Sequence, residues 1–262
     1  MTAQPGGVSL RAAVSSEWSK LWSIRSTYWS LAVTAVLVVG FVLLITLSAA
    51  ATNANGIEVL PMTPAEVAGG GMFYLGQLGL AALAALNIAG EYASGSILAT
   101  LQWVPRRGRM LLSKLLVVSS VLFVAGAAIT GLGVLAGMRP LEGISAAWDL
   151  QQVLADMAKI GLYSAVVGVI ALGLGAAIRS IAGTLACTVL LLVVVPQALA
   201  STGIDFLITL SDLFPGPAGM ALLDGVLGQA GHSMPVALAI LLVWCITILG
   251  LGSFVLLSRD AT

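Results

Sequence analysis

The sequence predicts an all-α integral membrane protein, and three observations carry this prediction. Hydrophobic residues make up 59% of the 262-residue chain, whereas soluble domains contain about 45–50% apolar residues. Charged residues make up only 8% of the chain, against about 25% in soluble domains. The apolar residues are also gathered in runs of about 20, the length that a helix needs to cross the hydrocarbon core of a bilayer.

Six such runs divide the chain, which we treat as one membrane domain, residues 1–262. A membrane-spanning segment must pair its backbone polar groups internally, so each run is expected to form a helix. The first run contains no charged residue, whereas the second is interrupted by Gln77 and Asn87. The predicted spans are residues 28–51, 69–90, 111–136, 153–178, 181–200 and 235–257.

The residues before the first span predict an amphipathic helix that lies in the membrane interface, residues 8–27. Val14, Trp18, Leu21 and Trp22 recur at helical spacing, while serines and a lysine occupy the other faces. Tryptophan favours the boundary between lipid and water, which supports this position. The alternative is a flexible tail held at the membrane by a tryptophan anchor.

The connections between the spans differ in basic residues, and this difference predicts the orientation. Nine of the eleven Lys and Arg residues lie at the two ends of the chain, between the second and third spans, or between the fourth and fifth spans. Only Arg139 and Lys159 lie in the alternate connections. Because basic connections stay in the cytoplasm, both termini are expected to be cytoplasmic.

The longest external connection, residues 201–234, is partly apolar and contains the segment LFPGPAGMALLDG. As an ordinary surface loop it would leave many Leu and Phe side chains in water. We expect it to form short helices at the membrane surface, where protein shields the backbone.

The sequence offers no catalytic or metal-binding pattern. His232 is the only histidine, and no second histidine or cysteine stands at ligand spacing from it. Cys187 and Cys245 lie inside apolar runs and are expected to be buried hydrophobic residues. No G-x-x-x-x-G-K-[ST] motif is present, and the formal net charge of zero offers no strong field for nucleic acid. We therefore expect no enzyme activity, no cofactor and no nucleic-acid partner for this chain.

The connection between the second and third spans, GEYASGSILATLQWVPRRGRMLLSK, is the most informative segment. Glu91 follows the second span, a half-apolar stretch comes next, and Pro105 ends that stretch. A short helix with apolar anchors and a charged rim suits a groove on a soluble partner. We interpret the stretch as a docking element with the anchors Ile97, Leu98, Leu101 and Trp103.

An alternative gives the basic residues of this connection a simpler role. They would fix the topology and contact anionic lipid headgroups, and Lys114 would be an ordinary lysine at the membrane boundary. This alternative accounts for the arginines, but it explains neither Glu91 nor the apolar stretch. The arginines are Arg106, Arg107 and Arg109.

Three segments resemble the integral-membrane permease subunit of the type-2 ABC transporters, which are mostly exporters. EWSKLWSIRSTYW looks like the interfacial helix of that family, and GEYASGSILATLQWVPRRGRMLLSK looks like its coupling segment. LFPGPAGMALL is similar to its Pro-rich segment before the last span. The order and spacing of these segments relative to the six predicted spans match the family over essentially the whole chain.

The resemblance implies a membrane subunit of an ATP-driven exporter in a bacterial plasma membrane. It implies a dimer with a second permease copy, identical or related, and two copies of a separate cytoplasmic ATPase that binds ATP and Mg. Family members of this kind export drugs, peptides or lipid-linked molecules, and some confer antibiotic resistance by efflux.

The resemblance also assigns roles to residues. The stretch that begins at Glu91 matches the coupling helix, which seats in a cleft of the ATPase, and the residues around Trp18 match the interfacial helix beside it. The coupling residues are Glu91, Ser94, Gly95, Ile97, Leu98, Leu101, Trp103, Pro105, Arg106 and Arg107. The residues of the interfacial helix are Trp18, Lys20, Trp22 and Arg25.

Polar residues of the second and fifth spans are the expected lining of a substrate path. The hypothesis is that the docked segment moves as a lever and changes how these two spans face each other. The alternative is that these residues only hydrogen-bond to neighbouring helices. Pro196 is expected to kink the fifth span. The lining residues are Gln77, Asn87, Thr184, Thr188 and Gln197.

Two functions from other classes remain open. An ion- or proton-coupled secondary transporter would use Asp156 and Lys159, because ionisable groups at membrane depth are functional candidates. A simple ion pair three residues apart on one helix face is the alternative for these two residues. A structural membrane adaptor would form complexes without transport.

Overall fold

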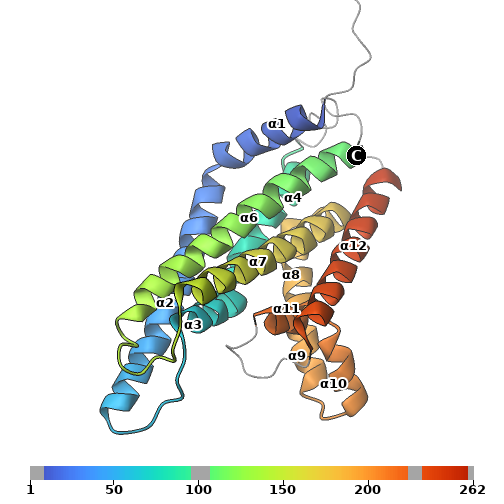
Figure 1. Cartoon of the computed structure of the whole chain (residues 1–262). Helices are drawn as coiled ribbons and strands as arrows, with labels where there is room; N and C mark the ends of the chain where they lie inside the picture. Colours follow the sequence, from blue (N-terminus) through green and yellow to red (C-terminus); the bar gives the residue numbers. More distant parts are fainter. Residues whose placement is uncertain (1–8, 96–106, 224–231, 259–262) are drawn as a thin grey trace, which may run out of the picture.

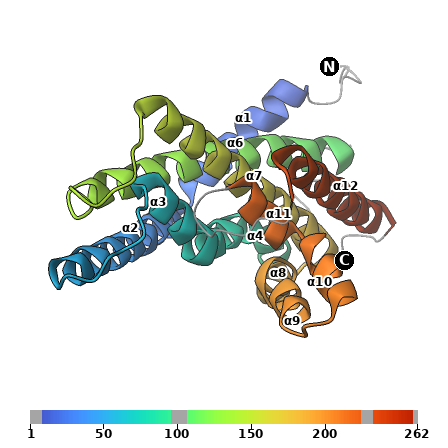
Figure 2. The same cartoon turned by 60° about the horizontal axis from the view of Figure 1, so that its bottom comes forward.

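The computed structural model describes residues 9–95, 107–223 and 232–258, and the regular secondary structure of these ranges is helical. Figures 1 and 2 show the helices packed as one bundle. In chain order they are α1 (Leu10–Ser23), α2 (Arg25–Ala54), α3 (Pro64–Gly71), α4 (Gln77–Ala93), α6 (Arg107–Met138), α7 (Leu150–Ile178), α8 (Ile181–Val189), α9 (Val195–Ala200), α10 (Asp205–Asp212), α11 (Pro215–Leu222) and α12 (Met234–Ser258).

Six helical stretches in the described part of the chain are long and apolar enough to cross a membrane, which confirms the prediction of six spans. Two of them are interrupted by a π-helical turn, η1 (Met72–Gly76) between α3 and α4 and η2 (Leu190–Val194) between α8 and α9. The six stretches are Arg25–Ala54, Pro64–Ala93, Gly108–Met138, Leu150–Ile178, Ile181–Ala200 and Met234–Leu256.

The second span begins at Pro64, five residues before the start that we expected, because a cap sets its first turn. The Thr63 hydroxyl accepts from the Glu66 N–H at 3.1 Å, and the Glu66 carboxylate accepts from the Thr63 N–H at 2.7 Å. This reciprocal pair satisfies two N–H groups that a helix start leaves open. The apolar run alone missed this start because Glu66 interrupts it.

The N-terminal helix ends at Ser23, and α2 begins two residues later, at Arg25, at an angle to it (Figure 1). The backbone of Ile24 is extended, with φ −97° and ψ 125°, and separates the two helices. Side-chain hydroxyls satisfy the carbonyls that the end of α1 leaves open. Ser23 donates to the Lys20 carbonyl at 2.8 Å, Thr27 to the Leu21 carbonyl at 2.6 Å, and Tyr28 to the Trp22 carbonyl at 3.0 Å.

Helix α7 lies at the centre of the bundle, with α2 and the α8–α10 group on opposite sides of it (Figure 2). Two-thirds of its apolar window, 67%, is buried, against 17% for α12 and 22% for α2. Small residues allow α7 to approach its neighbours closely. A Cβ atom on Gly161 would lie 2.7 Å from the carbonyl oxygen of Phe123 in α6, so only glycine fits there.

Pro196 is the second residue of α9 in the fifth span, and the expected kink at this residue stays a prediction. Proline has no N–H to donate to the carbonyl four residues earlier, that of Leu192, and the π-helical turn η2 comes directly before α9. Gly216 of α11 lies against the Leu192 carbonyl, at a distance that no side chain allows. The described part of the external connection forms the short helices α10 and α11 that we expected, and α11 packs on the π-helical turn η2 of the fifth span.

The close contact between α6 and α7 gives a first testable prediction. Gly161→Ala should lower the free energy of unfolding by about 1–3 kcal/mol, because the added methyl group must push two helix backbones apart. The measurement is the midpoint of thermal unfolding of the purified protein in a mild detergent.

Gly250→Ala is the matched control, because a Cβ atom at Gly250 in α12 meets nothing within 4 Å. It should leave the midpoint unchanged or raise it slightly, since alanine is the better helix former. Equal effects of the two substitutions would contradict the close-packing interpretation.

Candidate functional site

Four charged side chains from three helices form a cluster where α1 crosses the bundle, and we call them the ion cluster. The cluster consists of Glu17 and Lys20 of α1, Glu91 of α4 and Lys114 of α6. Two carboxylates and two ammonium groups balance each other. Residues that lie up to 97 positions apart in the sequence are thereby held within hydrogen-bond distance.

Lys114 is the centre of the ion cluster, and its side chain is completely buried. Its ammonium group donates to Glu17 Oε2 at 2.6 Å, to Glu91 Oε1 at 2.8 Å and to the Asn87 carbonyl at 3.3 Å. These three acceptors use all three N–H donors of a lysine. The alternative that made Lys114 an ordinary lysine at the lipid boundary is therefore wrong, since its side chain is enclosed by protein.

Lys20 closes the cluster from the side of α1. Its ammonium group contacts Glu17 Oε1 at 2.9 Å and Glu91 Oε1 at 3.2 Å. Partial burial would lower the pKa of Lys20, but the two carboxylates outweigh burial and raise the pKa above its ordinary value of 10.5. Lys20 therefore carries its charge throughout the physiological pH range.

Glu17 is the residue of the cluster that our sequence analysis missed. It bridges both lysines and is only 3% exposed, whereas Trp18, which we placed on the apolar face of the interfacial helix, is 49% exposed. The buried stripe of α1 consists of Ala13, Glu17 and Leu21, at intervals of four residues. A carboxylate in the middle of such a stripe was the available signal, because a buried acid requires a cationic partner.

The other expected residues of the interfacial helix lie near the junction of α1 and α2. Trp18 and Trp22 meet edge to face with ring centroids 5.8 Å apart, and Trp22 also contacts the Tyr28 ring at 5.6 Å. Arg25 is exposed at the start of α2. The aromatic side chains therefore gather where α1 meets α2.

The end of α4 is fixed by more than the ion cluster. The guanidinium group of Arg179, in the turn between α7 and α8, lies 5.0 Å from the centroid of the Tyr92 ring, within range of a cation–π interaction. Arg179 caps α7 with a positive φ of 61°, which side chains other than glycine adopt at a cost. The last turn of α4 thus contacts α1, α6 and the α7–α8 turn.

The structure places only part of the predicted docking segment. Ser94 caps α4 and donates to the Gly90 carbonyl at 2.9 Å, and Gly95 follows with a positive φ of 72°, which ends the helix. Arg107 is the first residue of α6. The other predicted coupling residues, Ile97, Leu98, Leu101, Trp103, Pro105 and Arg106, lie outside the described residues.

The expected residues of the substrate path differ in their burial and in their hydrogen bonds. Gln77 is buried and accepts a hydrogen bond of 2.6 Å from the Tyr163 hydroxyl of α7. Thr184 and Thr188 are buried as well, and each hydroxyl donates to the carbonyl four residues earlier in its own helix. Asn87 is half-buried and Gln197 is exposed, so their contact with a substrate stays a prediction.

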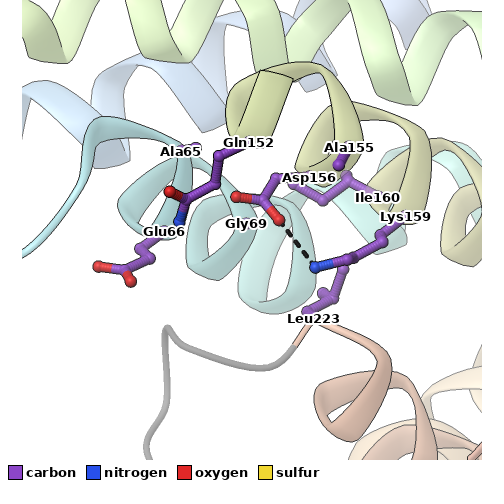
Figure 3. A pocket seen from close by; sticks show the side chains of 9 residues that line it. All are labelled: Ala65, Glu66, Gly69, Gln152, Ala155, Asp156, Lys159, Ile160 and Leu223. Atoms are coloured by element: carbon purple, nitrogen blue, oxygen red, sulfur yellow. Dashed lines mark hydrogen bonds and ion pairs between the residues drawn. The ribbon is translucent and has the colours of Figure 1, made fainter. Parts of the chain in front are cut away.

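A pocket of about 120 Å³ lies at the other end of the bundle, between the first turns of α3 and α7 (Figure 3). Glu66, Gln152, Asp156 and Lys159 point toward it or line its rim. Lys159 and Asp156 form the ion pair expected from their spacing, with 2.9 Å between the charged groups. None of the five predicted path residues lines this pocket.

No protein-family model matches the chain, and no curated protein matches it. Among the described residues, no three His, Cys, Asp or Glu side chains form a group that could hold a metal ion. The candidate site therefore depends on the geometry of the ion cluster and on the sequence around it.

The buried lysine gives a second testable prediction. Lys114→Met should lower the free energy of unfolding by about 3–5 kcal/mol, because Glu17 and Glu91 would stay buried with only Lys20 to neutralise them. Thermal unfolding in detergent, followed by tryptophan fluorescence, measures the loss.

Lys159→Met is the comparison, because it also removes one lysine of an ion pair but does so at a half-exposed position. Its cost should stay below about 1 kcal/mol. If Lys114→Met were as mild as Lys159→Met, the ion cluster would not hold α1 in place.

Proposed function

We propose that this chain is the membrane-spanning subunit of an ATP-driven ABC exporter, and that a separate ATPase subunit hydrolyses ATP. The observation that carries the proposal is the ion cluster, which joins α1 to the last turn of α4 and to α6. These two helices bracket the predicted docking segment, residues 94–105. The ion cluster holds together the two helices that flank the docking segment. A displacement of this segment by a partner would therefore be transmitted to α1, α4 and α6.

The orientation that the proposal requires places the docking segment in the cytoplasm. Figure 1 shows α1, the end of α4, the start of α6 and the last turn of α12 at one end of the bundle. Most of the basic residues belong to this end, and the positive-inside rule makes it cytoplasmic. Trp18, Trp22 and Tyr28 are suited to the membrane boundary there, with α1 lying in the interface.

The proposed assembly contains two copies of the ATPase and a second permease, either a copy of this chain or a related one, in a bacterial plasma membrane. ATP and Mg bind to the ATPase. When its two copies close on ATP, the docking segment moves, and the ion cluster makes α1, α4 and α6 follow together. A ligand drives such a change only if its contacts differ between the two states.

The proposed substrate path follows α4 and the fifth span, α8–α9. Gln77 is buried and its amide oxygen accepts a hydrogen bond from Tyr163 of α7, so α4 must shift against α7 before the Gln77 amide can meet a substrate. The π-helical turns η1 and η2 in these two spans suit such a movement, since π turns are frequent at functional sites. Gln197 is exposed on α9, where its amide can contact a substrate or the second permease.

The orientation leads to a third prediction. Trp103→Cys, in a chain whose Cys187 and Cys245 are replaced by alanine, should escape an impermeant thiol reagent in intact cells and react after permeabilisation. Asn55→Cys, in the connection after α2, should react in intact cells and serves as the control. Labelling of Trp103→Cys in intact cells would overturn the proposed function.

The partner leads to a fourth prediction. An ATPase should co-purify with the chain from native membranes in mild detergent. The double reversal Arg106→Glu and Arg107→Glu should weaken its binding by about tenfold or more, because like charges would then face each other in the contact. Transport-linked ATP hydrolysis should fall with the binding.

Arg139→Glu reverses an exposed charge in the connection after α6, at the other end of the bundle, and should leave ATPase binding unchanged. Repeated absence of an ATPase would contradict the proposal. Transport in vesicles without an ATPase, lost on Asp156→Asn, would favour a proton- or ion-coupled carrier. Stable complexes without transport would favour an adaptor.

A further inference from the structure

The pocket between α3 and α7 is lined by both polar and apolar side chains (Figure 3). Glu66, Gln152, Asp156 and Lys159 provide charged and amide groups, while Ile160 and Leu223 are apolar. Glu66 and Gln152 stand in the first turns of their helices, so the pocket lies where α3 and α7 begin. The lining residues come from two helices that start at this end and from the end of α11.

The charges in the pocket favour a cation. Two carboxylates and one ammonium group are among the lining side chains, and Lys159 forms its ion pair of 2.9 Å with Asp156. One oxygen of Glu66 accepts from the Thr63 N–H, and its second oxygen forms no hydrogen bond within the described structure. A group with several N–H donors would find acceptors on Glu66, on Asp156 and on the Gln152 amide.

The helix starts beside the pocket do not favour an anion, although open N–H groups at such positions usually bind anions. The Thr63 hydroxyl accepts from the Glu66 N–H at 3.1 Å in the first turn of α3. The Asp149 carboxylate accepts from the Gln152 N–H at 2.7 Å in the first turn of α7. Both starts are therefore already capped by oxygen atoms of the chain itself.

The size of the pocket limits the ligand to a small group. A volume of about 120 Å³ is well below that of a typical drug-sized site. It suits a primary ammonium group with a few methylene carbons, whose carbons can lie against Ile160 and Leu223. A larger molecule can place only its amine end in the pocket.

We propose that this pocket binds the ammonium group of a primary amine, supplied either by a small free amine or by the headgroup of an ethanolamine lipid. Both sources share the three N–H donors and the short carbon chain. The pocket lies at the end of membrane-spanning helices, where a lipid headgroup and a dissolved amine both have access. This inference does not depend on the proposed exporter function.

The test uses the full chain in nanodiscs of phosphatidylcholine, because the headgroup of this lipid has no N–H donor. Ethanolamine is added at constant ionic strength, and binding is measured by calorimetry. In a second arm, phosphatidylethanolamine replaces part of the lipid, and the thermal unfolding midpoint is recorded. Heat of binding with ethanolamine supports a free amine, whereas a rise of the midpoint only in the second arm supports a lipid headgroup.

Glu66→Gln is the decisive variant, because glutamine preserves the cap of α3 while it removes the charge. It should weaken amine binding by about tenfold or more, since one ionic hydrogen bond is lost. Glu142→Gln, in the exposed connection between α6 and α7, is the control and should bind like the wild type. Calorimetry of sodium propionate, at the same ionic strength, tests the charge preference.

Three results would overturn the proposal. The first is the absence of a response in both arms, and the second is equal binding by the wild type and Glu66→Gln. The third is binding of propionate as strong as that of ethanolamine. Because none of these measurements involves an ATPase, their failure would be distinguishable from failure of the proposed function.

Discussion

The burial of Lys114 is the constraint on which the rest of the structure depends. A lone ammonium group shielded from water is very costly, so it persists only where anions and carbonyl oxygens surround it. Glu17 and Glu91 supply the anions, and they stand on two other helices. The need to match one charge therefore fixes α1 across the ends of α4 and α6.

The two ends of the bundle are organised by different interactions. At the end with the ion cluster, charges from distant parts of the chain meet, and Arg179 covers Tyr92 beside them. At the opposite end, the helices begin with local caps such as Thr63 with Glu66. Between the two ends, close packing around α7 supplies the contacts, because lipid gives the helices no hydrophobic reason to associate. A displacement at the end with the ion cluster can therefore be transmitted to the opposite end through helices that are in close contact.

The fold was largely predictable because the length of an apolar run is a physical requirement of the bilayer. All six spans follow from that requirement, and the apolar character of the last external connection predicted the short helices α10 and α11. The helix starts were less predictable. Glu66 was treated as an interruption, although with Thr63 it forms the cap that begins the second span.

The candidate site was predictable only in parts. The sequence analysis named Glu91, Lys20 and Lys114, but it gave each residue a separate role and did not predict that they form one cluster. The contact between these three residues depends on the angle between α1 and α2, which is set at Ile24. No local sequence pattern predicts this angle. Glu17 was missed because the helix was analysed by its apolar residues alone. The role of residues 96–106 still depends on sequence, because they lie outside the described residues.

The ion cluster also has a consequence for the order in which the protein is made. Synthesis runs from the N-terminus, so the ribosome adds Glu17 and Glu91 before Lys114. Until the third span has been made, Lys20 is the one ammonium group of the ion cluster that can pair with Glu17 and Glu91. The buried arrangement of α1 across α4 and α6 can therefore form only after the third span has delivered Lys114.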